Sequence, residues 1–384
     1  MRHTKTNSQN GHGFTLLELM VSMAVGLIVM AAMTSLFKTG LNSTILVTQR
    51  AETQQNMRAA MDLMVKDISL AGSGLPSGGL QLPINGGATA ARYGCDQGGV
   101  CHVTTHSYAG NFMYGIIPGF SNGVEGGAVI PAAPAPTVND SITVIYADYN
   151  FPLYEYNVTF PINPDGTSIC LTVNNTYSAA PPLPVNASGG IQQGDLILIN
   201  PTTGNSVVGE VTNVTANTIT FANTDPLNFN YSKNGTTTNN VYSASAGTGY
   251  SCPPPVTVAP APQITQGVAY RLYVVTYYLT VPAVAGQTPR LMRQVNGLAP
   301  VPVADDIINL QFAYDSYNTT VTPATLDANQ PNPLGVGESP NNFQKVNIVM
   351  MGQSILSNGK TNSQNMYLAT SVSARNMAFA NRYK

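Results

Sequence analysis

The sequence predicts an α+β protein in which a long N-terminal helix packs on a mostly antiparallel β-sheet head with large loop insertions. Three features predict this class: an almost wholly apolar run at residues 13–37, apolar side chains at helical spacing over residues 57–68, and short β-branched runs from residue 141 onward. The helix and the sheet each have an apolar face that the other can cover, which is the packing typical of α+β proteins.

The first 13 residues are polar and basic, with Arg2 and Lys5 and no acid. The apolar run that follows carries one acid, Glu18. A secretory signal has a shorter apolar core followed by a small-residue cleavage site. Here the Gly13–Phe14 junction precedes the apolar run, so cleavage at this junction would leave the helix in the mature chain. A simple N-terminal anchor is the alternative, but an acid within a spanning helix is costly and usually functional.

A carboxylate at the edge of a hydrocarbon layer costs about 3 kcal/mol on insertion scales, so Glu18 needs a compensating charge. Cleavage before Phe14 would create an α-ammonium group four residues away. We expect this group to pair with Glu18 of a neighbouring subunit, which suits filament assembly. Basic residues precede the span and none lie within it. This favours a cytoplasmic N-terminus and places the chain after about Lys38 outside the cytoplasmic membrane.

We expect one helix from Phe14 to Ala71, with a transmembrane or filament-core half at residues 14–38 and an amphipathic half at residues 39–71. The amphipathic half carries apolar side chains at spacings close to helical: Leu41, Ile45, Met57, Met61, Met64 and Ile68. Polar side chains, Asp67 among them, stand between these positions. A Gly- and Pro-containing run after Ala71 ends the helix. The apolar stripe should therefore lie against the head.

Residues 72–140 indicate a loop-rich insertion and residues 141–384 the β-sheet head, with a variable loop at 224–263 that we expect to be extended and exposed. Strands are expected where β-branched runs are bordered by turn residues. These runs are 141–148, 167–173, 194–200, 206–214, 217–223, 269–281, 290–295, 307–315, 345–356 and 367–376. The third, fourth and fifth runs have the pattern of a meander. Residues 316–343 lack structure signals.

Only 9% of the residues are charged, against a usual value of about 25%, and the formal net charge is −2. This composition offers no basic surface, so no nucleic-acid partner is expected. The sequence lacks the motifs of zinc proteases, of phosphate-binding loops and of dinucleotide-binding folds. We therefore expect that the protein is not an enzyme and has no catalytic residues and no cofactor.

The four cysteines agree with an oxidising compartment, where disulfides persist. Cys95 and Cys101 are close in sequence and should close a small loop. Cys170 and Cys252 would then pair across the middle of the head. Sequence alone allows three pairings of four cysteines.

Two metal sites are alternative interpretations of the cysteine loop and of the acidic residues. The thiols of the small loop, together with His102 and His106, could bind zinc. Oxygen ligands that suit calcium occur at Asp305, Asp306 and in residues 225–240, without the spacing of an EF-hand. A disulfide in the first case and solvated loops in the second are our expectations, so no metal site is predicted.

The motif G-F-T-L-L-E at Gly13–Glu18 resembles the type III signal of type IV prepilins and of type II secretion pseudopilins. The resemblance implies the type IV pilin fold. It also implies that a membrane peptidase cuts between Gly13 and Phe14 and that Phe14, the new N-terminus, is methylated. Glu18 would become the fifth residue of the mature chain, where we expect it to serve assembly.

Several stretches resemble PilW-type minor pilins: residues 58–72, 194–199, 277–279 with 290–293, 307–315 and 371–376. This resemblance implies a minor structural subunit of a type IV pilus that acts in pilus initiation or at the tip. Its partners would be other minor pilins, the major pilin, the prepilin peptidase, the inner-membrane pilus assembly machinery and a large tip adhesin. The chain would cross the inner membrane once, with its head in the periplasm, and become extracellular on assembly.

Two other functions stay open at this point. A J-type pseudopilin of type II secretion shares the leader and the helix, although the heads of such proteins are usually smaller. The unmatched loops at 72–140 and 224–263 could instead make the head an adhesin or a DNA receptor, and the low net charge argues against DNA.

Overall fold

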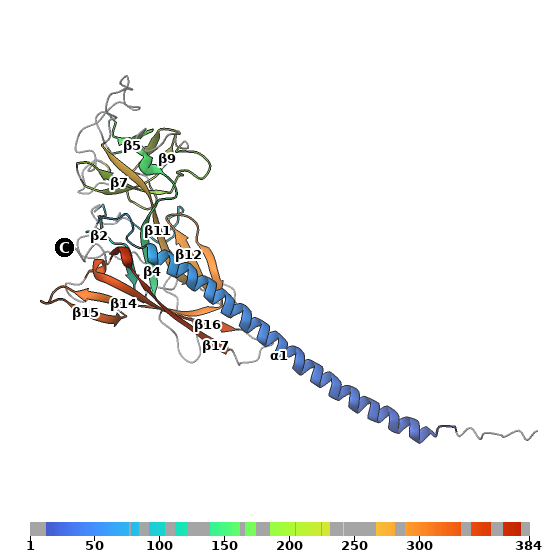
Figure 1. Ribbon diagram of the computed structural model, residues 1–384. Helices are drawn as coiled ribbons and strands as arrows, with labels where there is room; N and C mark the ends of the chain where they lie inside the picture. Colours follow the sequence, from blue (N-terminus) through green and yellow to red (C-terminus); the bar gives the residue numbers. More distant parts are fainter. Residues whose placement is uncertain are drawn as a thin grey trace, which may run out of the picture. The chain divides into compact units, whose positions relative to one another are not determined.

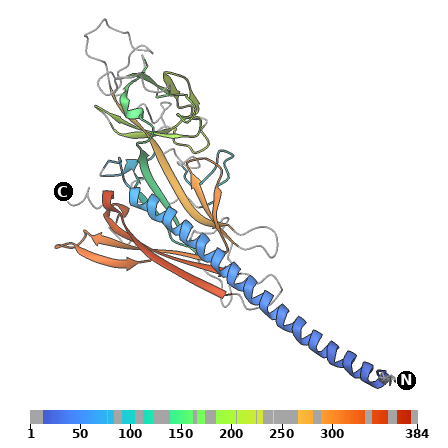
Figure 2. The same cartoon turned by 45° about the vertical axis from the view of Figure 1, so that its right-hand side comes forward.

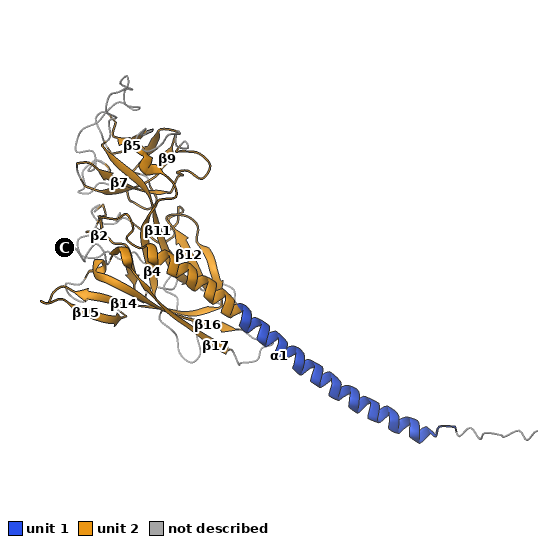
Figure 3. Ribbon diagram, in the orientation of Figure 1, with its two compact units in different colours: residues 1–52, 356–362 blue, residues 53–355, 363–384 orange. Residues whose placement is uncertain are grey.

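The computed structural model describes residues 13–76, 78–83, 92–103, 112–121, 139–161, 166–173, 185–203, 205–223, 225–230, 241, 266–280, 289–331, 339–354 and 364–377. The chain divides into two compact units, which Figure 3 colours separately. Unit 1 comprises Met1–Glu52 and Leu356–Asn362, and unit 2 comprises Thr53–Ile355 and Ser363–Lys384. Helix α1 (Leu16–Leu70) contributes its first part to unit 1 and its last part to unit 2.

Helix α1 begins and ends within two residues of the predicted bounds. Its buried side chains all belong to unit 2: Thr53, Met57, Ala60, Met61, Met64, Asp67 and Ile68. The predicted stripe therefore starts later than expected, because Leu41 and Ile45 are exposed. Gly72 ends the helix with a positive φ of 79°, and a Cβ there would lie 2.8 Å from Met377. Only glycine adopts this left-handed conformation without strain while leaving that space free.

The central part of unit 2 is an antiparallel sheet that contains β3 (Ile116–Gly119), β4 (Ser141–Asp148), β11 (Gly267–Thr280), β12 (Arg290–Val295) and β13 (Val301–Asp305). Strand β11 organises this sheet. Its C-terminal half pairs with β12 on one side and with β4 on the other. Its N-terminal half pairs with strands that lie between β4 and β11 in the sequence, so β11 runs from one part of the head into the other (Figures 1 and 2).

The described residues within 149–266 form what we call the inserted lobe. Its described elements are η2 (Leu153–Glu155), β5 (Tyr156–Thr159), β6 (Ser168–Val173), β7 (Leu196–Pro201), β8 (Val207–Glu210), β9 (Asn213–Val214) and β10 (Thr218–Thr220). The predicted meander of residues 194–223 is confirmed in its pairing, because its first run pairs with its second and its second with its third, although the second run is divided into β8 and β9. Strands β7 and β8 form one hairpin and β9 and β10 another, but β10 continues the sheet through β6. The lobe has an apolar core of its own, which includes Phe160, Phe221 and Val241.

A second, four-stranded antiparallel sheet has the order β15 (Thr325–Gln330), β14 (Ile307–Asn318), β16 (Phe343–Ser354) and β17 (Gln364–Ser373). Strand β15 lies in the stretch without structure signals, so that expectation was wrong. Pairing with β14 stabilises it, since Thr325 is the one residue of its sequence TLDANQ that is a usual strand former. The short η3 turn (Pro340–Asn342) leads into β16, and a small separate sheet joins β1 (Leu80–Gln81) and β2 (Phe112–Met113).

The largest core of unit 2 joins the buried stripe of α1 to both sheets. It contains side chains from α1, β3, β4, β11, β12, β14 and β16, such as Met64, Tyr277 and Phe312. A third core, around Cys95, Leu198 and Phe229, lies between the central sheet and the inserted lobe. The long helix followed by antiparallel sheets confirms the predicted α+β architecture, in which helix and sheets cover each other's apolar faces.

Candidate functional site

The N-terminal junction lies directly before the first turn of α1. Thr15 Oγ1 accepts a hydrogen bond from the Glu18 N–H at 3.3 Å, and the Thr15 N–H donates to Glu18 Oε2 at 3.5 Å. This reciprocal pair is the capping-box arrangement, in which a residue at the helix start and the acid three positions later satisfy each other's backbone donors. The arrangement holds the Glu18 carboxylate at the helix start, next to the Gly13–Phe14 junction. The T-x-x-E spacing of Thr15 and Glu18 is a local sequence signal for this cap, in addition to the charge from which we expected a role for Glu18.

The segment after the junction is long and apolar enough to cross a membrane. Its most apolar 18-residue window has a mean hydropathy of 2.3, and none of that window is buried. Hydroxyl groups within it bond to the helix backbone: Ser22 Oγ donates to Glu18 O at 2.7 Å and Thr34 Oγ1 to Met30 O at 2.8 Å. These bonds remove the cost of placing hydroxyl groups in hydrocarbon.

Residues 9–34 match the family model described as the prokaryotic N-terminal methylation motif. The motif indicates a type IV pilin or pseudopilin. The matched residues include the Gly13–Phe14 junction, Glu18 and the first half of the apolar segment, and they end before the head. The chain has no significant match among curated proteins or among solved structures.

The pilin-type motif has direct consequences for the chain. It implies processing by a prepilin peptidase and use of the pilus assembly machinery, and it suggests a structural subunit rather than an enzyme. Together with the apolar helix, it fits membrane anchoring before assembly. Gly13 and Phe14 lie just before the helix and are exposed, which leaves the bond between them accessible.

The cysteines occupy the head. Cys95 and Cys101 form a disulfide, the pair that the spacing predicted. This bond uses both sulfur atoms of the alternative zinc site, and His106 lies outside the described residues. Cys170 is buried in β6, whereas Cys252 also lies outside the described residues, so the Cys170–Cys252 bond stays a prediction.

Within the described ranges, no group of three or more His, Cys, Asp or Glu side chains is placed to hold a metal ion. His102 stacks on Tyr278 with ring centroids 5.5 Å apart, and its Nε2 lies 3.7 Å from Asp96 Oδ2. Asp305 is paired with Arg290 at 2.8 Å. Asp225 is buried, so the expectation of a solvated loop at this residue was wrong.

An ionic network fixes α1 to the head. Asp67 is buried and accepts hydrogen bonds from Tyr146 Oη at 3.1 Å, Tyr277 Oη at 2.6 Å and Arg293 Nε at 2.9 Å. Burial, together with the Asp67 charge, raises the pKa of both tyrosines, so both stay protonated donors. Asp67 was expected among the polar side chains that separate the apolar positions of the helix, and its burial shows that this expectation was wrong. Its position three residues after Met64 and next to Ile68 is the signal that places it on the buried side.

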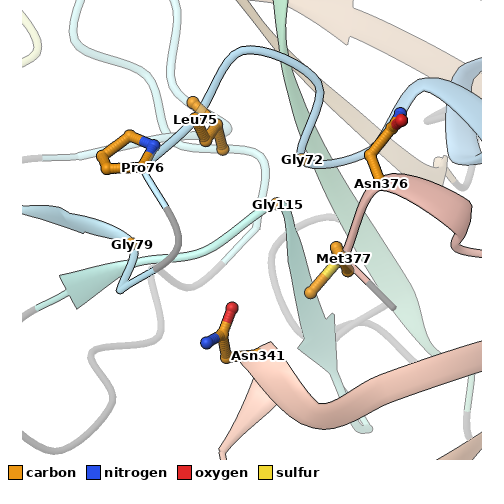
Figure 4. A pocket seen from close by; sticks show the side chains of 8 residues that line it. All are labelled: Gly72, Leu75, Pro76, Gly79, Gly115, Asn341, Asn376 and Met377. Atoms are coloured by element: carbon orange, nitrogen blue, oxygen red, sulfur yellow. The ribbon is translucent and has the colours of Figure 1, made fainter. Parts of the chain in front are cut away.

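Two cavities of the head are lined differently. Figure 4 shows a cavity of about 20 Å³, room for about one water molecule, where the end of α1 meets Gly115, Asn341 and Met377. A larger hollow of about 330 Å³ lies between Leu63 and hairpin β12–β13, with a mainly aliphatic lining and Arg293 at its wall. Within the described residues, neither cavity brings a nucleophile and a base together.

Proposed function

We propose that the protein is a minor structural subunit of a type IV pilus that assembles through α1 and acts in pilus initiation or at the tip. The observation that carries this proposal is the methylation motif continuous with an exposed apolar helix. In this proposal the prepilin peptidase cuts before Phe14, which is then methylated. Its ammonium group pairs with Glu18 of a neighbouring subunit, and the capping box holds that carboxylate at the helix start.

The size of the head supports a place at the tip. Packed helices lie about 8–10 Å apart, so subunits that assemble through their helices leave little lateral room for their heads. A head with an inserted lobe between β4 and β11 is accommodated most easily where one side has no neighbour. The partners are then other minor pilins, the major pilin, the inner-membrane assembly machinery and a tip adhesin. The resemblance of the stretches from residue 58 onward to PilW-type minor pilins supports the same role.

A J-type pseudopilin of type II secretion is the second candidate, because the matched motif at residues 9–34 serves pilins and pseudopilins alike. The two functions differ in where the chain is found. A minor pilin co-purifies with sheared surface pili, and its loss reduces piliation. A pseudopilin is absent from surface pili, and its loss blocks secretion of exoproteins.

Glu18→Ala tests the assembly role. We expect the variant to be inserted in the membrane at wild-type amounts but strongly depleted from purified filaments, because it lacks the carboxylate that meets the neighbour's ammonium group. Glu52→Ala is the matched control, since Glu52 is an exposed acid on the same helix and outside the apolar segment. Quantitative immunodetection compares filaments with membranes. Equal incorporation of Glu18→Ala and Glu52→Ala would refute the role.

A further inference from the structure

Strand β17 is the last strand of the four-stranded sheet, and β16 is its only partner among the described strands. The ladder between these two strands runs from Lys345↔Ser373 to Ser354↔Gln364 without a register shift. The other edge of β17 therefore presents backbone N–H and C=O groups that pair with no described strand. A long and regular edge of this kind is a template for pairing with a further strand.

The sequence of β17 lacks the features that protect the other edges of the head. Its residues, QNMYLATSVS, include no charged residue, no proline and no glycine. Among the described edge strands, β13 contains Pro302, β3 contains Pro118 and β15 contains Asp327. Strand β8 ends at Glu210, and β9 has only 2 residues. Charges, prolines and short strands prevent pairing at an edge, so β17 is the described edge that is open to it.

The core beneath β17 is incompletely covered at the same place. Side chains of β17 alternate between the core and the solvent. Met366 and Leu368 face the largest core but are only partly buried, whereas Val372 on the same row is buried. Tyr367, on the opposite row, is 71% exposed. One more strand beside β17 would cover Met366 and Leu368 and would remove apolar surface from water, which is favourable.

Strand β17 runs in the same direction as the end of α1 (Figures 1 and 2). A Cβ at Gly352, the register partner of Met366, would lie 2.6 Å from Met57 Sδ. Past the other end of β17, Met377 packs on Gly72, where a Cβ would lie 2.8 Å from its side chain. The strand therefore starts beside Met57 and ends near Gly72, parallel to the helix.

This direction argues against a second copy of the chain as the partner of β17. Antiparallel pairing of two β17 strands would reverse α1 in one copy. Copies that are anchored through α1 all point the same way, since each has its basic residues on the same side of the span. Parallel pairing in register would place two copies of Arg375, which is exposed two residues after β17, next to each other. Like charges at such positions are destabilising.

We propose that β17 binds an extended segment of another protein, which adds to the free edge as a further strand of the sheet. This segment has apolar side chains at alternate positions, which cover Met366 and Leu368, and an acidic residue at the end that lies beside Arg375. Backbone hydrogen bonds supply the affinity, and the alternate side chains supply the specificity. The proposal concerns the head and goes beyond the assembly role of α1, because it does not require that α1 enters a filament.

Site-specific photo-crosslinking of the full-length protein tests the added strand in cells that produce it. A photoreactive benzoylphenylalanine replaces Asn365, Tyr367 or Ala369 in turn, all exposed on the outer row of β17. We expect all three positions to crosslink to one segment of one partner. The site on the partner should move by about two residues for each step, because paired strands have the same side-chain period. Mass spectrometry maps the sites in membranes and in filaments separately, so that a chain excluded from filaments is still tested.

Charged substitutions test the contact independently. Leu368→Lys places a charge in the row that the segment covers and should lower the crosslink yield at Tyr367 by about tenfold or more, because a desolvated, unpaired charge is costly. Val349→Lys is the matched control, since Val349 is 43% exposed on β16, one strand away from the edge. Arg375→Glu should lower the yield by about two- to fivefold, the range of an exposed ion pair, and Arg375→Lys should retain it.

Several results would overturn the proposal. Crosslinks to β17 of a second copy, or to another segment of the same chain, would identify a different occupant. Crosslinks to scattered sites, or none in either fraction, would show that no strand is added. Equal yields in Leu368→Lys and Val349→Lys would have the same meaning, and equal yields in Arg375→Glu and Arg375→Lys would overturn the acidic end of the segment. If Leu368→Lys does not fold, the spacing of the crosslink sites decides.

Discussion

Replacement of Met64 by alanine tests whether the last part of α1 belongs to the core of the head. Met64 is 0% exposed and lies in the core that joins the helix to both sheets. Large-to-small changes of buried methionine cost about 2–5 kcal/mol, because the surroundings collapse only in part onto the cavity. Ile45 lies on the same helix at 43% exposure. Ile45→Ala should change the free energy of unfolding by less than about 0.5 kcal/mol, as surface changes usually do.

Thermal unfolding of a truncated protein that begins at Thr39 measures this difference without the apolar segment. The loss of about 2–5 kcal/mol corresponds to a fall in Tm of about 3–7 °C for a chain of this size, since the entropy of unfolding is about 2.1 cal/mol/K per residue. Removal of the whole stripe is a stronger perturbation. Burial of Met57, Met61, Met64 and Ile68 together contributes about 6–12 kcal/mol, which is comparable to a typical domain stability of about 5–15 kcal/mol. A protein that begins at Ser73 should therefore aggregate.

Two results would refute this reasoning. The first is an equal Tm for Met64→Ala and Ile45→Ala, which would mean that Met64 is not part of a cooperative core. The second is a soluble protein beginning at Ser73 that melts at the same temperature as the longer one. In that case the helix would be an appendage of the head and not one of its layers.

Three further predictions concern single residues. Asp67→Asn should lower the free energy of unfolding by about 2–3 kcal/mol, because it removes the charge that compensates the partly buried Arg293. Asp62→Asn is the control, since Asp62 is exposed on the same helix. Equal unfolding curves for the two variants would contradict the network. Cys170 and Cys252 should be joined, a loop closure worth about 4–5 kcal/mol in the chain-entropy model; non-reducing peptide mapping should find the linked peptides, and a free thiol at either position would exclude the bond. A bulky residue in place of Gly13 should block processing and leave the basic leader on the protein, as mass spectrometry of the membrane fraction would show; normal cleavage would exclude Gly13 as the recognised residue.

The elements with strong local signals were predictable from the sequence. Strands β4 and β12 have the bounds that the β-branched runs predicted, and α1 differs by no more than two residues at either end. In these segments local propensity and tertiary packing favour the same structure. The capping box at Thr15 and Glu18 could have been predicted as well, because its spacing is local.

Features that depend on long-range contacts were not predictable. The sequence TLDANQ becomes β15 because β14 offers a free edge, and the meander of residues 194–223 continues into β6 because β10 pairs with that strand across the lobe. Asp67, Glu210 and Asp225 carry acidic side chains, yet all three are buried. Their partners lie far away in sequence, such as Arg293 for Asp67 and Gln97 for Glu210. A polar residue is buried only when such partners are present, and one sequence does not show them.

The central claim is that the chain is a pilin-type subunit whose mature N-terminus starts the assembly helix. Mass spectrometry of the N-terminal peptide, from cells with an active prepilin peptidase, tests this claim most directly. We predict a mature chain that begins at Phe14 with one methyl group on its α-amine, with Glu18 as the fifth residue. An intact Met1, or an N-terminus after the apolar segment, would contradict the account.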